Sequence, residues 1–254
     1  MSPPVEAQRQ FWLWTEDGVA ISARHDPGAG PPDLGFVVVH GFTGHADRPA
    51  VRAIVAALRR HGGVVSLDLR GHGRSGGLSS VGQYEVLDLA AAVGWARALG
   101  YRRLVTVGWS LGATVVLQHG ARHCGEQAVV AVSGPSRWYY RGTRPMWLLH
   151  HAVTRRTGRW VLRTWFRTRV DPARWDPVPE PPDVAVARIA PVPLLLVHGD
   201  ADHYFPLDHP RRLAEAAGPA AQLWIEPGFG HAENSATPQL VDRIGAWADR
   251  VTSP

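Results

Sequence analysis

Short apolar runs alternate with segments of helical periodicity along most of the chain. Runs of this kind, rich in Val, Leu and Ile, are typical of strands that are buried on both faces of a sheet. The pattern predicts strands near residues 35–39, 64–69, 103–108, 128–133, 192–199 and 221–226. It predicts helices near residues 48–62, 84–100, 111–123, 209–218 and 238–251. Strands that alternate with helices predict an α/β fold with a mostly parallel, doubly wound sheet.

The alternation changes at two places. Residues 11–25 form two β-like runs around Asp17-Gly18, a dipeptide that favours a tight turn, so an N-terminal antiparallel hairpin is expected. Residues 135–190 contain aromatic residues, arginines and prolines without a clear strand, and this stretch is too long for a plain loop. We therefore predict a core of residues 1–134 and 191–254, with a helical cap or lid inserted at residues 135–190.

The sequence Gly108-Trp109-Ser110-Leu111-Gly112 lies where a predicted strand passes into a predicted helix. A serine hydroxyl is a weak nucleophile and needs a fixed, exposed position and a base. A sharp strand-to-helix turn, the nucleophile elbow, provides this position, and its crowding excludes bulky residues two places before and after the serine. Gly108 and Gly112 meet this condition, so Ser110 is the candidate nucleophile.

Acyl transfer at a serine also requires N–H donors for the oxyanion. The Leu111 N–H comes at the start of the predicted helix, where the helix dipole favours negative charge. The strand at residues 35–39 ends in His40-Gly41, and Gly41 allows the backbone to turn so that the Phe42 N–H points at the same oxygen. Phe42 and Leu111 are therefore the expected oxyanion donors.

His231 is the candidate base among thirteen histidines. It follows the last predicted strand, and loops at the carboxyl ends of parallel strands gather at one edge of the sheet, where the nucleophile is expected. His203 and His209 are weaker candidates because they precede that strand, and His72 is a candidate for the pocket lining.

The acid that orients the histidine is expected after the strand at residues 192–199. Asp200 and Asp202 both follow this strand, in the chain order nucleophile, acid, base. The residues alone leave open which of the two reaches the site.

The motifs HGF, DLRGHGRS, GWSLG, HGDAD and GFGH stand in the order found in serine hydrolases of the α/β-hydrolase fold, and they extend over nearly the whole chain. The chain resembles this family, which includes esterases, lipases and monoacylglycerol-lipase-like enzymes. The resemblance implies an α/β-hydrolase fold with Ser110 as nucleophile, Asp202 as acid and His231 as base. Asp202 is preferred because the acid usually follows a glycine, here Gly199, by three residues. Trp109 departs from the histidine that many members carry before the nucleophile, and we expect it to pack behind the turn.

Charge is concentrated in the predicted cap. All 27 basic residues are arginines, of which nine lie in residues 137–169 without any acid, whereas the rest of the chain has 18 arginines against 22 acids. Residues 155–170 have helical spacing, with one basic face and one apolar face. The basic face contains Arg156, Arg159, Arg163 and Arg167, and the apolar face contains Val161 and Trp165, flanked by Leu162 and Phe166.

Two interpretations of this helix stay open. It is a cap helix with a solvated basic face and an apolar face on the pocket, or its arginines attract an anionic group. Phospholipid headgroups and the phosphates of a carrier-bound acyl thioester are the candidate anions, whereas nucleic acid is not expected. The candidates for the pocket or the cap are His40, Trp109, Trp138, Tyr139 and Trp147.

Several other protein classes are not expected. Residues 71–76 spell G-x-G-x-x-G, but a dinucleotide site needs a helix that opens within this motif, and no helical pattern starts there. No His, Cys or carboxylate cluster has metal-ligand spacing, so neither a metal nor another cofactor is expected. No apolar run approaches the ~20 residues of a transmembrane segment. Residues 1–10 lack the features of a signal peptide, so a cytoplasmic protein is expected, with Cys124 as a passive packing residue.

We therefore predict a serine hydrolase that cleaves a carboxylic ester with an apolar acyl group through an acyl-enzyme. An acyl thioesterase for carrier- or CoA-linked substrates is an alternative that rests on the basic cap. Epoxide and haloalkane hydrolysis are disfavoured, because the resembling enzymes of those kinds have Asp in place of the serine. A non-catalytic ligand-binding protein on the same fold is an alternative of another class.

Overall fold

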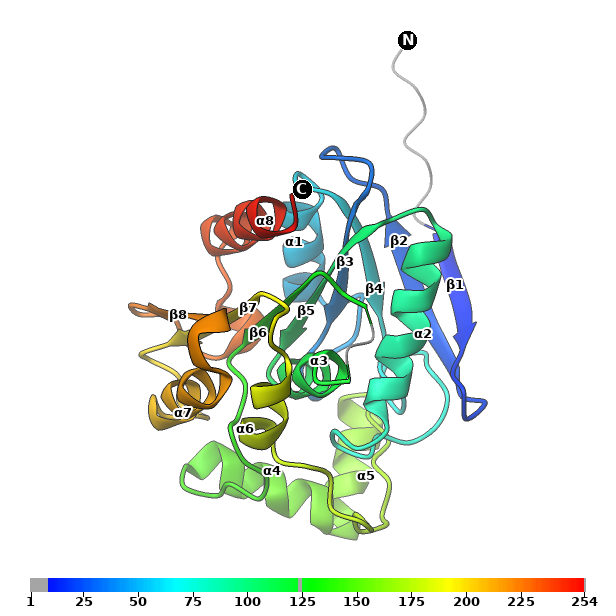
Figure 1. Ribbon diagram of the computed structural model, residues 1–254. Helices are drawn as coiled ribbons and strands as arrows, with labels where there is room; N and C mark the ends of the chain where they lie inside the picture. The colour runs from blue at the N-terminus through cyan, green and yellow to red at the C-terminus, as the bar shows by residue number, and fades with distance from the viewer. Residues whose placement is uncertain (1–8, 123–124, 254) are drawn as a thin grey trace.

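One mixed sheet organises the protein, and a computed structural model describes it for residues 9–122 and 125–253 (Figure 1). The strand order in this described part is β1-β2-β4-β3-β5-β6-β7-β8. The β1–β2 and β2–β4 pairs are antiparallel, and the other pairs are parallel. The strands are β1 (Arg9–Trp14), β2 (Ala20–Asp26), β3 (Leu34–Val39), β4 (Gly63–Leu67), β5 (Arg103–Trp109), β6 (Ala128–Val132), β7 (Leu194–Gly199) and β8 (Ala221–Glu226). The predicted mostly parallel sheet with an N-terminal antiparallel hairpin is confirmed.

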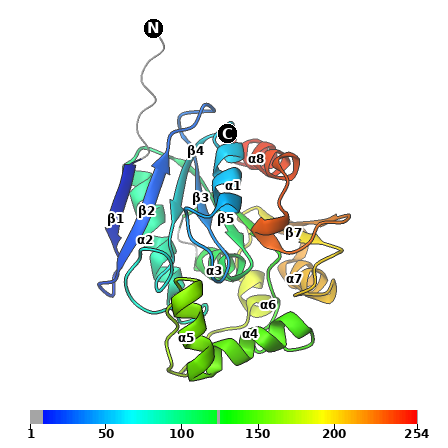
Figure 2. The ribbon, with the colours of Figure 1, turned by 180° about the vertical axis from the view of Figure 1, so that it is seen from behind.

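Helices cover both faces of the sheet (Figures 1 and 2). One face carries α1 (Pro49–Leu58) and α8 (Pro238–Thr252), which pack against each other. The other face carries α2 (Glu85–Ala98), α3 (Leu111–Gly120) and α7 (Asp208–Ala217). Strand β3 is buried along its whole length, and its alternate residues join the two hydrophobic clusters: Phe36 packs with α1 and α8, and Val37 packs with α2 and α3. The apolar runs that form β3 to β7 are therefore strands with two buried faces.

The predicted insertion contains α4 (Arg144–Thr154), α5 (Arg156–Trp165), α6 (Pro182–Ala185) and a 3₁₀ turn at Val186–Arg188. Helices α4 and α5 pack together at the end of the molecule opposite the C-terminus (Figure 1). In contrast, Ala185, Val186 and Ile189 are buried in the hydrophobic cluster of α2 and α3. We therefore propose that the cap consists of α4 and α5, and that residues 182–189 pack as part of the core.

The apolar face of α5 differs from the prediction at one residue. Trp165 is 74% exposed and does not line the cavity that lies between α5 and Ser110, whereas Leu162 lines it and is only 5% exposed. Leu162 and Phe166 are one turn apart and point inward together, because residues i and i+4 share a helix face. The prediction that Trp165 faces the pocket is therefore wrong, and the inward face is centred on Leu162.

None of the helices formed by residues 9–122 and 125–253 is both long and apolar enough to cross a membrane. The predictions for residues 1–8 and for Cys124 lie outside the described residues.

Candidate active site

Ser110 occupies a strained turn between β5 and α3. Its backbone has φ 51° and ψ −109°, a region that residues with a side chain rarely adopt. The turn is crowded as the sequence indicated: a Cβ on Gly108 would lie 2.1 Å from the Gly112 carbonyl oxygen, and one on Gly112 would lie 2.3 Å from the Val39 oxygen. The two glycines thus permit a close approach that holds Ser110 at the carboxyl end of the sheet.

His231 lies between Ser110 and Asp202. Its Nε2 is 2.9 Å from the Ser110 Oγ, and its Nδ1 is 2.8 Å from the Asp202 Oδ2. The imidazole stacks on the Tyr204 ring at a centroid distance of 4.2 Å, and the Phe205 ring meets it at 5.6 Å and a steep angle. The structure thus brings together three residues from loops after β5, β7 and β8, and aromatic rings fix the orientation of the imidazole.

Asp202, rather than Asp200, reaches the histidine. The Asp202 side chain is completely buried, and its Oδ1 accepts hydrogen bonds from the N–H groups of Tyr204 (2.8 Å) and Phe205 (3.1 Å). Burial raises the pKa of the Asp202 carboxyl, but the hydrogen bond from His231 and the other favourable contacts outweigh this effect and keep the pKa below its ordinary value. Asp200 is exposed, and its Oδ1 accepts the Gly228 N–H at 2.7 Å.

The other candidate histidines lie elsewhere. His203 is exposed, and the Nδ1 of buried His209 accepts the Ser136 N–H at 2.9 Å. His72 is buried beneath the site, with its ring 5.6 Å from the Phe42 ring, and it does not line the cavity. Burial lowers the pKa of His72 to about 3 and that of His209 to about 4, so both are neutral near pH 7. The prediction that His72 lines the pocket is wrong, because the loop that follows β4 places the His72 ring against Phe42, away from the cavity.

Phe42 and Leu111, the expected oxyanion donors, both line the same cavity as Ser110. Leu111 is the first residue of α3, and the first N–H groups of a helix have no partner within the helix. Its N–H is therefore available for an oxygen atom that sits over Ser110.

The peptide group that joins Gly41 to Phe42 is held in place by hydrogen bonds to the Gly41 carbonyl oxygen. The Leu69 N–H donates to the His40 Nε2 at 3.0 Å, so a neutral His40 carries its proton on Nδ1. This Nδ1–H donates to the Gly41 carbonyl oxygen at 2.7 Å, and the Gly44 N–H donates to it at 2.9 Å. In a trans peptide the Phe42 N–H points away from this carbonyl. His40, predicted for the pocket, is fully buried behind the loop and outside the cavity lining.

A cavity of about 1630 Å³ lies between the core and the cap, and Ser110 and His231 are among its lining residues. Of the remaining pocket candidates, Trp138 and Tyr139 line it. Trp109 is fully buried behind the turn among the sheet residues, as its expected packing position requires. Trp147 is 49% exposed and outside the lining, because it lies on the outer side of α4.

Glu233 is a residue of the site that the sequence analysis missed. Its Oε1 accepts the Gly41 N–H at 2.6 Å, and the side chain lines the cavity. The available signal was a carboxylate two residues after the candidate base, but no sequence pattern indicates a contact between residues 192 positions apart.

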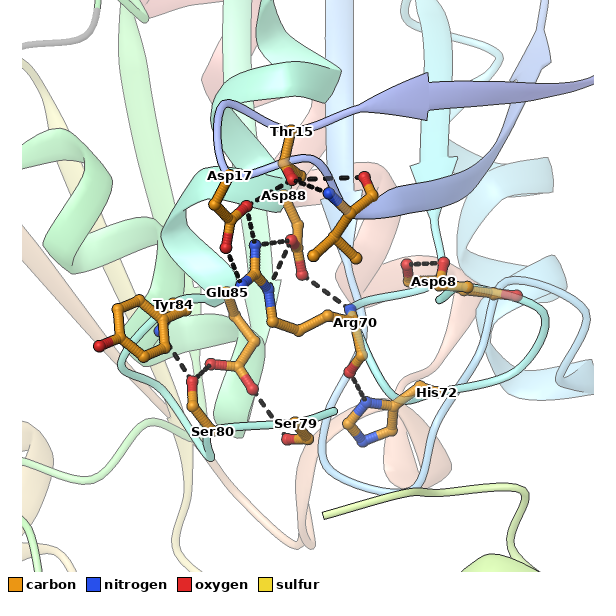
Figure 3. Close-up of polar contacts among 12 residues, drawn as sticks. Thr15, Asp17, Asp68, Arg70, His72, Ser79, Ser80, Tyr84, Glu85 and Asp88 are labelled. Carbon is orange, nitrogen blue, oxygen red and sulfur yellow. Dashed lines mark hydrogen bonds and ion pairs between the residues drawn. The ribbon is translucent and has the colours of Figure 1, made fainter. Parts of the chain in front are cut away.

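A buried arginine anchors the loop that joins β4 to α2 (Figure 3). The Arg70 guanidinium donates to Asp88 on α2 at 2.9 Å and to Asp17 in the β1–β2 turn at 2.7 and 3.0 Å. The Arg70 N–H also donates to Asp88, at 2.7 Å. The Arg70 side chain is only 5% exposed, so this network joins the edge hairpin to the middle of the domain.

Glu85, the first residue of α2, shapes the same loop where it borders the cavity. Its carboxylate accepts hydrogen bonds from the Ser79 and Ser80 hydroxyls at 2.8 and 2.6 Å (Figure 3). It also accepts hydrogen bonds from the N–H groups of Val81 and Gly82 at 3.0 and 2.8 Å. Ser80 and Val81 line the cavity, so this carboxylate defines part of its wall.

The described residues offer no group of three His, Cys or carboxylate side chains placed to hold a metal ion. The G-x-G-x-x-G motif at residues 71–76 is followed by a loop, and α2 begins only at Glu85. The motif therefore does not open a helix, as a dinucleotide site would require.

This architecture is that of an α/β hydrolase. It has the sheet order, the helices on both faces, and the serine in a strained strand-to-helix turn that define this class. The family described as alpha/beta hydrolase fold matches residues 36–177, more than half of the chain, and the chain belongs to this family.

Named relatives are found by sequence and by structure. The monoacylglycerol lipase of Mycolicibacterium smegmatis is 28% identical in an alignment that covers 83% of this chain and 86% of that protein. The esterase Pf2001 of Pyrococcus furiosus superimposes with a TM-score of 0.78 at 22% identity over 97% of this chain and 94% of that one. Est1E of Butyrivibrio proteoclasticus, solved with ferulic acid bound, superimposes with a TM-score of 0.65 at 19% identity, over 92% of this chain and 96% of that one. The two structures share the fold.

Proposed function

We propose that the protein is an esterase of the lipase-like type, which cleaves carboxylic esters with an apolar acyl group. The observation that carries this proposal is the continuous contact from Asp202 through His231 to Ser110, at 2.8 and 2.9 Å, beside a large cavity. The similarity to a monoacylglycerol lipase and the shared fold with esterases support the same class of reaction.

The proposed reaction has two halves. His231 removes the proton from the Ser110 hydroxyl, and the Oγ attacks the ester carbonyl while the buried carboxylate of Asp202 stabilises the imidazolium. The N–H groups of Phe42 and Leu111 stabilise the tetrahedral oxyanion. His231 then protonates the departing alkoxide, which leaves an acyl-Ser110 ester. In the second half His231 takes a proton from a water molecule, whose oxygen attacks this ester, and then returns that proton to the Ser110 Oγ as the acid leaves.

The apolar acyl preference rests on the cavity walls. Side chains from both cap helices and from the core contribute apolar surface next to Ser110. The apolar lining residues include Phe42, Val81, Leu111, Met146, Leu149, Val153, Val161, Leu162, Phe166 and Phe205. An acyl chain that enters this cavity gains about 0.8 kcal/mol for each CH₂ group that it buries.

A series of p-nitrophenyl esters from acetate to palmitate tests this preference. We expect kcat/KM to rise with acyl length by up to about fourfold per buried CH₂ before it levels off. Phe166→Ala should flatten the rise, because this side chain lines the cavity. Trp165→Ala on the same helix is the control, because Trp165 is exposed and outside the lining.

A profile that falls from acetate onward would contradict the apolar acyl site. The same acyl chains are measured as CoA thioesters, and a higher kcat/KM for the thioesters would favour the thioesterase alternative, which Arg141, Arg144 and Arg174 in the cavity lining support. Absence of turnover with both series would favour a ligand-binding protein.

The outer side of α5 supports a further proposal about a partner. Arg156, Trp160 and Arg163 are exposed, with Trp160 at 62%, and helical spacing puts them on one face. Residues 137–169 contain no acid that would neutralise this face. An exposed Trp between arginines suits the headgroup region of an anionic bilayer. We propose that this face of the cap docks on anionic phospholipid, which brings the cavity towards a lipid ester.

Sedimentation with vesicles measures this docking without turnover. We expect binding to vesicles that contain 30% phosphatidylglycerol, weak binding to pure phosphatidylcholine, and loss of binding at high salt. Replacing Arg156 and Arg163 by Gln should weaken binding by roughly 30-fold, at about 1 kcal/mol per arginine. Trp160→Ala should also weaken it.

The matched controls for docking lie elsewhere on the molecule. Trp14→Ala removes a tryptophan that is 70% exposed on β1, and Arg250→Gln removes an exposed arginine on α8. Equal binding to neutral vesicles, or equal losses in the control variants, would contradict a docking face on α5.

A further inference from the structure

Glu233 places a carboxylate against the loop expected to hold the oxyanion. Its Oε1 accepts the Gly41 N–H at 2.6 Å, on the residue that precedes Phe42. We propose that Glu233 is a positioning residue, which fixes the Gly41 backbone and so aims the Phe42 N–H at the oxyanion. This inference rests on the proposed esterase function and assigns a residue outside the Ser110, His231 and Asp202 contacts.

Gly41 needs external support on both sides. Glycine has the widest range of φ and ψ of any residue, so the two peptide planes that meet at its Cα are not fixed by a side chain. His40 and Gly44 fix the plane after Gly41 by their hydrogen bonds to its carbonyl oxygen. Glu233 fixes the plane before it through the N–H. The Phe42 N–H lies in the second plane, and Glu233 acts on it indirectly, because the two planes meet at the Gly41 Cα and a shift of the first displaces the second.

Glycine at position 41 and glutamate at position 233 fit each other sterically. A Cβ at Gly41 would lie 3.1 and 3.2 Å from the two carboxylate oxygens of Glu233 and 3.2 Å from the Ser110 Cβ. These separations are tighter than normal carbon contacts, so a side chain at position 41 would push the carboxylate or Ser110 away. The absence of a side chain is therefore what allows the carboxylate to reach the backbone beside the nucleophile.

One short turn positions both Glu233 and His231. The 3₁₀ turn Ala232–Ser235 follows His231 directly, and the Ala232 N–H donates to the Ser133 Oγ at 3.1 Å at the end of β6. His231 contacts Ser110 from the residue directly before this turn, and Glu233 contacts Gly41 from within it. The base and the oxyanion loop are thus held in register by the same segment.

The role of Glu233 is geometric. A negative charge next to a developing oxyanion is unfavourable, so the useful property of this side chain is the acceptor oxygen at Gly41. Glu233→Gln keeps an oxygen of the same reach and removes the charge, whereas Glu233→Ala removes the acceptor. A positioning role thus predicts that Gln substitutes for Glu and Ala does not.

Steady-state kinetics with a p-nitrophenyl ester test the proposal. Glu233→Ala should lower kcat by about 10- to 100-fold and change KM by less than about threefold. The upper end of this loss in kcat corresponds to the complete loss of one oxyanion donor. Glu233→Gln should keep kcat within about threefold of wild type or raise it. A trifluoromethyl ketone, which forms a tetrahedral oxyanion on the serine, should bind Glu233→Ala more weakly by the same factor as the loss in kcat/KM.

Two further variants keep the test decisive. Gln239→Ala is the control, since Gln239 is an exposed polar residue at the start of α8 and outside the cavity lining, and it should retain wild-type kcat. If Glu233→Ala folds poorly, Glu233→Asp shortens the reach to the Gly41 N–H by one CH₂ and should show an intermediate loss of kcat at an unchanged melting temperature.

The outcomes separate the two proposals. Wild-type kcat in Glu233→Ala, or a loss in Glu233→Gln as large as in Glu233→Ala, overturns the positioning role while the esterase function stands. A folded wild type that neither hydrolyses esters nor reacts with a fluorophosphonate overturns the esterase function, and the role of Glu233 with it.

Discussion

Ser110→Ala should lower ester hydrolysis by about 10⁶-fold and abolish labelling by a fluorophosphonate probe. The Ser110 Oγ is the atom that faces the His231 Nε2 at 2.9 Å, so its removal leaves the proposed base without a nucleophile. The substitution removes one oxygen atom and leaves the cavity otherwise unchanged, and the variant should therefore retain its melting temperature. Turnover of a p-nitrophenyl ester and gel fluorescence of the probe measure the two effects.

Thr43→Ala is the matched control, because Thr43 also presents a hydroxyl-bearing side chain to this cavity, away from the His231 contact. It should be labelled at the wild-type rate. A labelled Ser110→Ala protein would show that the probe reacts at another residue.

Asp202→Asn should lower kcat by about 10³- to 10⁴-fold, whereas Asp200→Asn should change it by only a few-fold. An amide at position 202 presents a donor to the imidazole or fails to stabilise its cation. It also loses the carboxylate that hydrogen bonds keep ionised despite its burial. Asn at position 200 still offers an oxygen to the Gly228 N–H. Kinetics of both variants on one ester, with circular dichroism as a check of folding, measure the difference.

The reverse result, with the large loss in Asp200→Asn, would mean that the loop after β7 rearranges during catalysis. Equal small losses in both variants would mean that the imidazole needs no carboxylate partner in this protein.

The middle of the sheet was predictable because strands β3 to β7 are buried on both faces. Continuous runs such as residues 36–39 and 194–197 have no polar side chain to place, so their length and their flanking turns identify them. The same logic located Ser110 and the pair Asp200 and Asp202, which follow buried strands, whereas His231 follows the half-buried edge strand β8. The residues alone left both aspartates open and the family resemblance favoured Asp202, and in the loop Asp202 turns inward and Asp200 outward.

The cap and the oxyanion loop were less predictable for different reasons. Tryptophan and arginine occur on several sides of α4 and α5, so composition does not reveal which face points inward, and Trp147 and Trp165 are exposed. His72 was misplaced because a buried, neutral histidine leaves no pattern in the sequence. Glu233 escaped notice because its partner is a backbone N–H, which every residue except proline provides.

The Arg70 network has a consequence for rebuilding this chain. Asp17 belongs to the outermost hairpin, yet it holds the arginine that anchors the loop of Ser80 and Val81. A circular permutant opened at Asp17-Gly18, or a fusion partner inserted there, would cut the tether between the sheet edge and the substrate pocket. Exposed hairpin tips ordinarily tolerate circular permutation and domain insertion well. In this protein the tip at Gly218, between α7 and β8, is the safer place to open the chain.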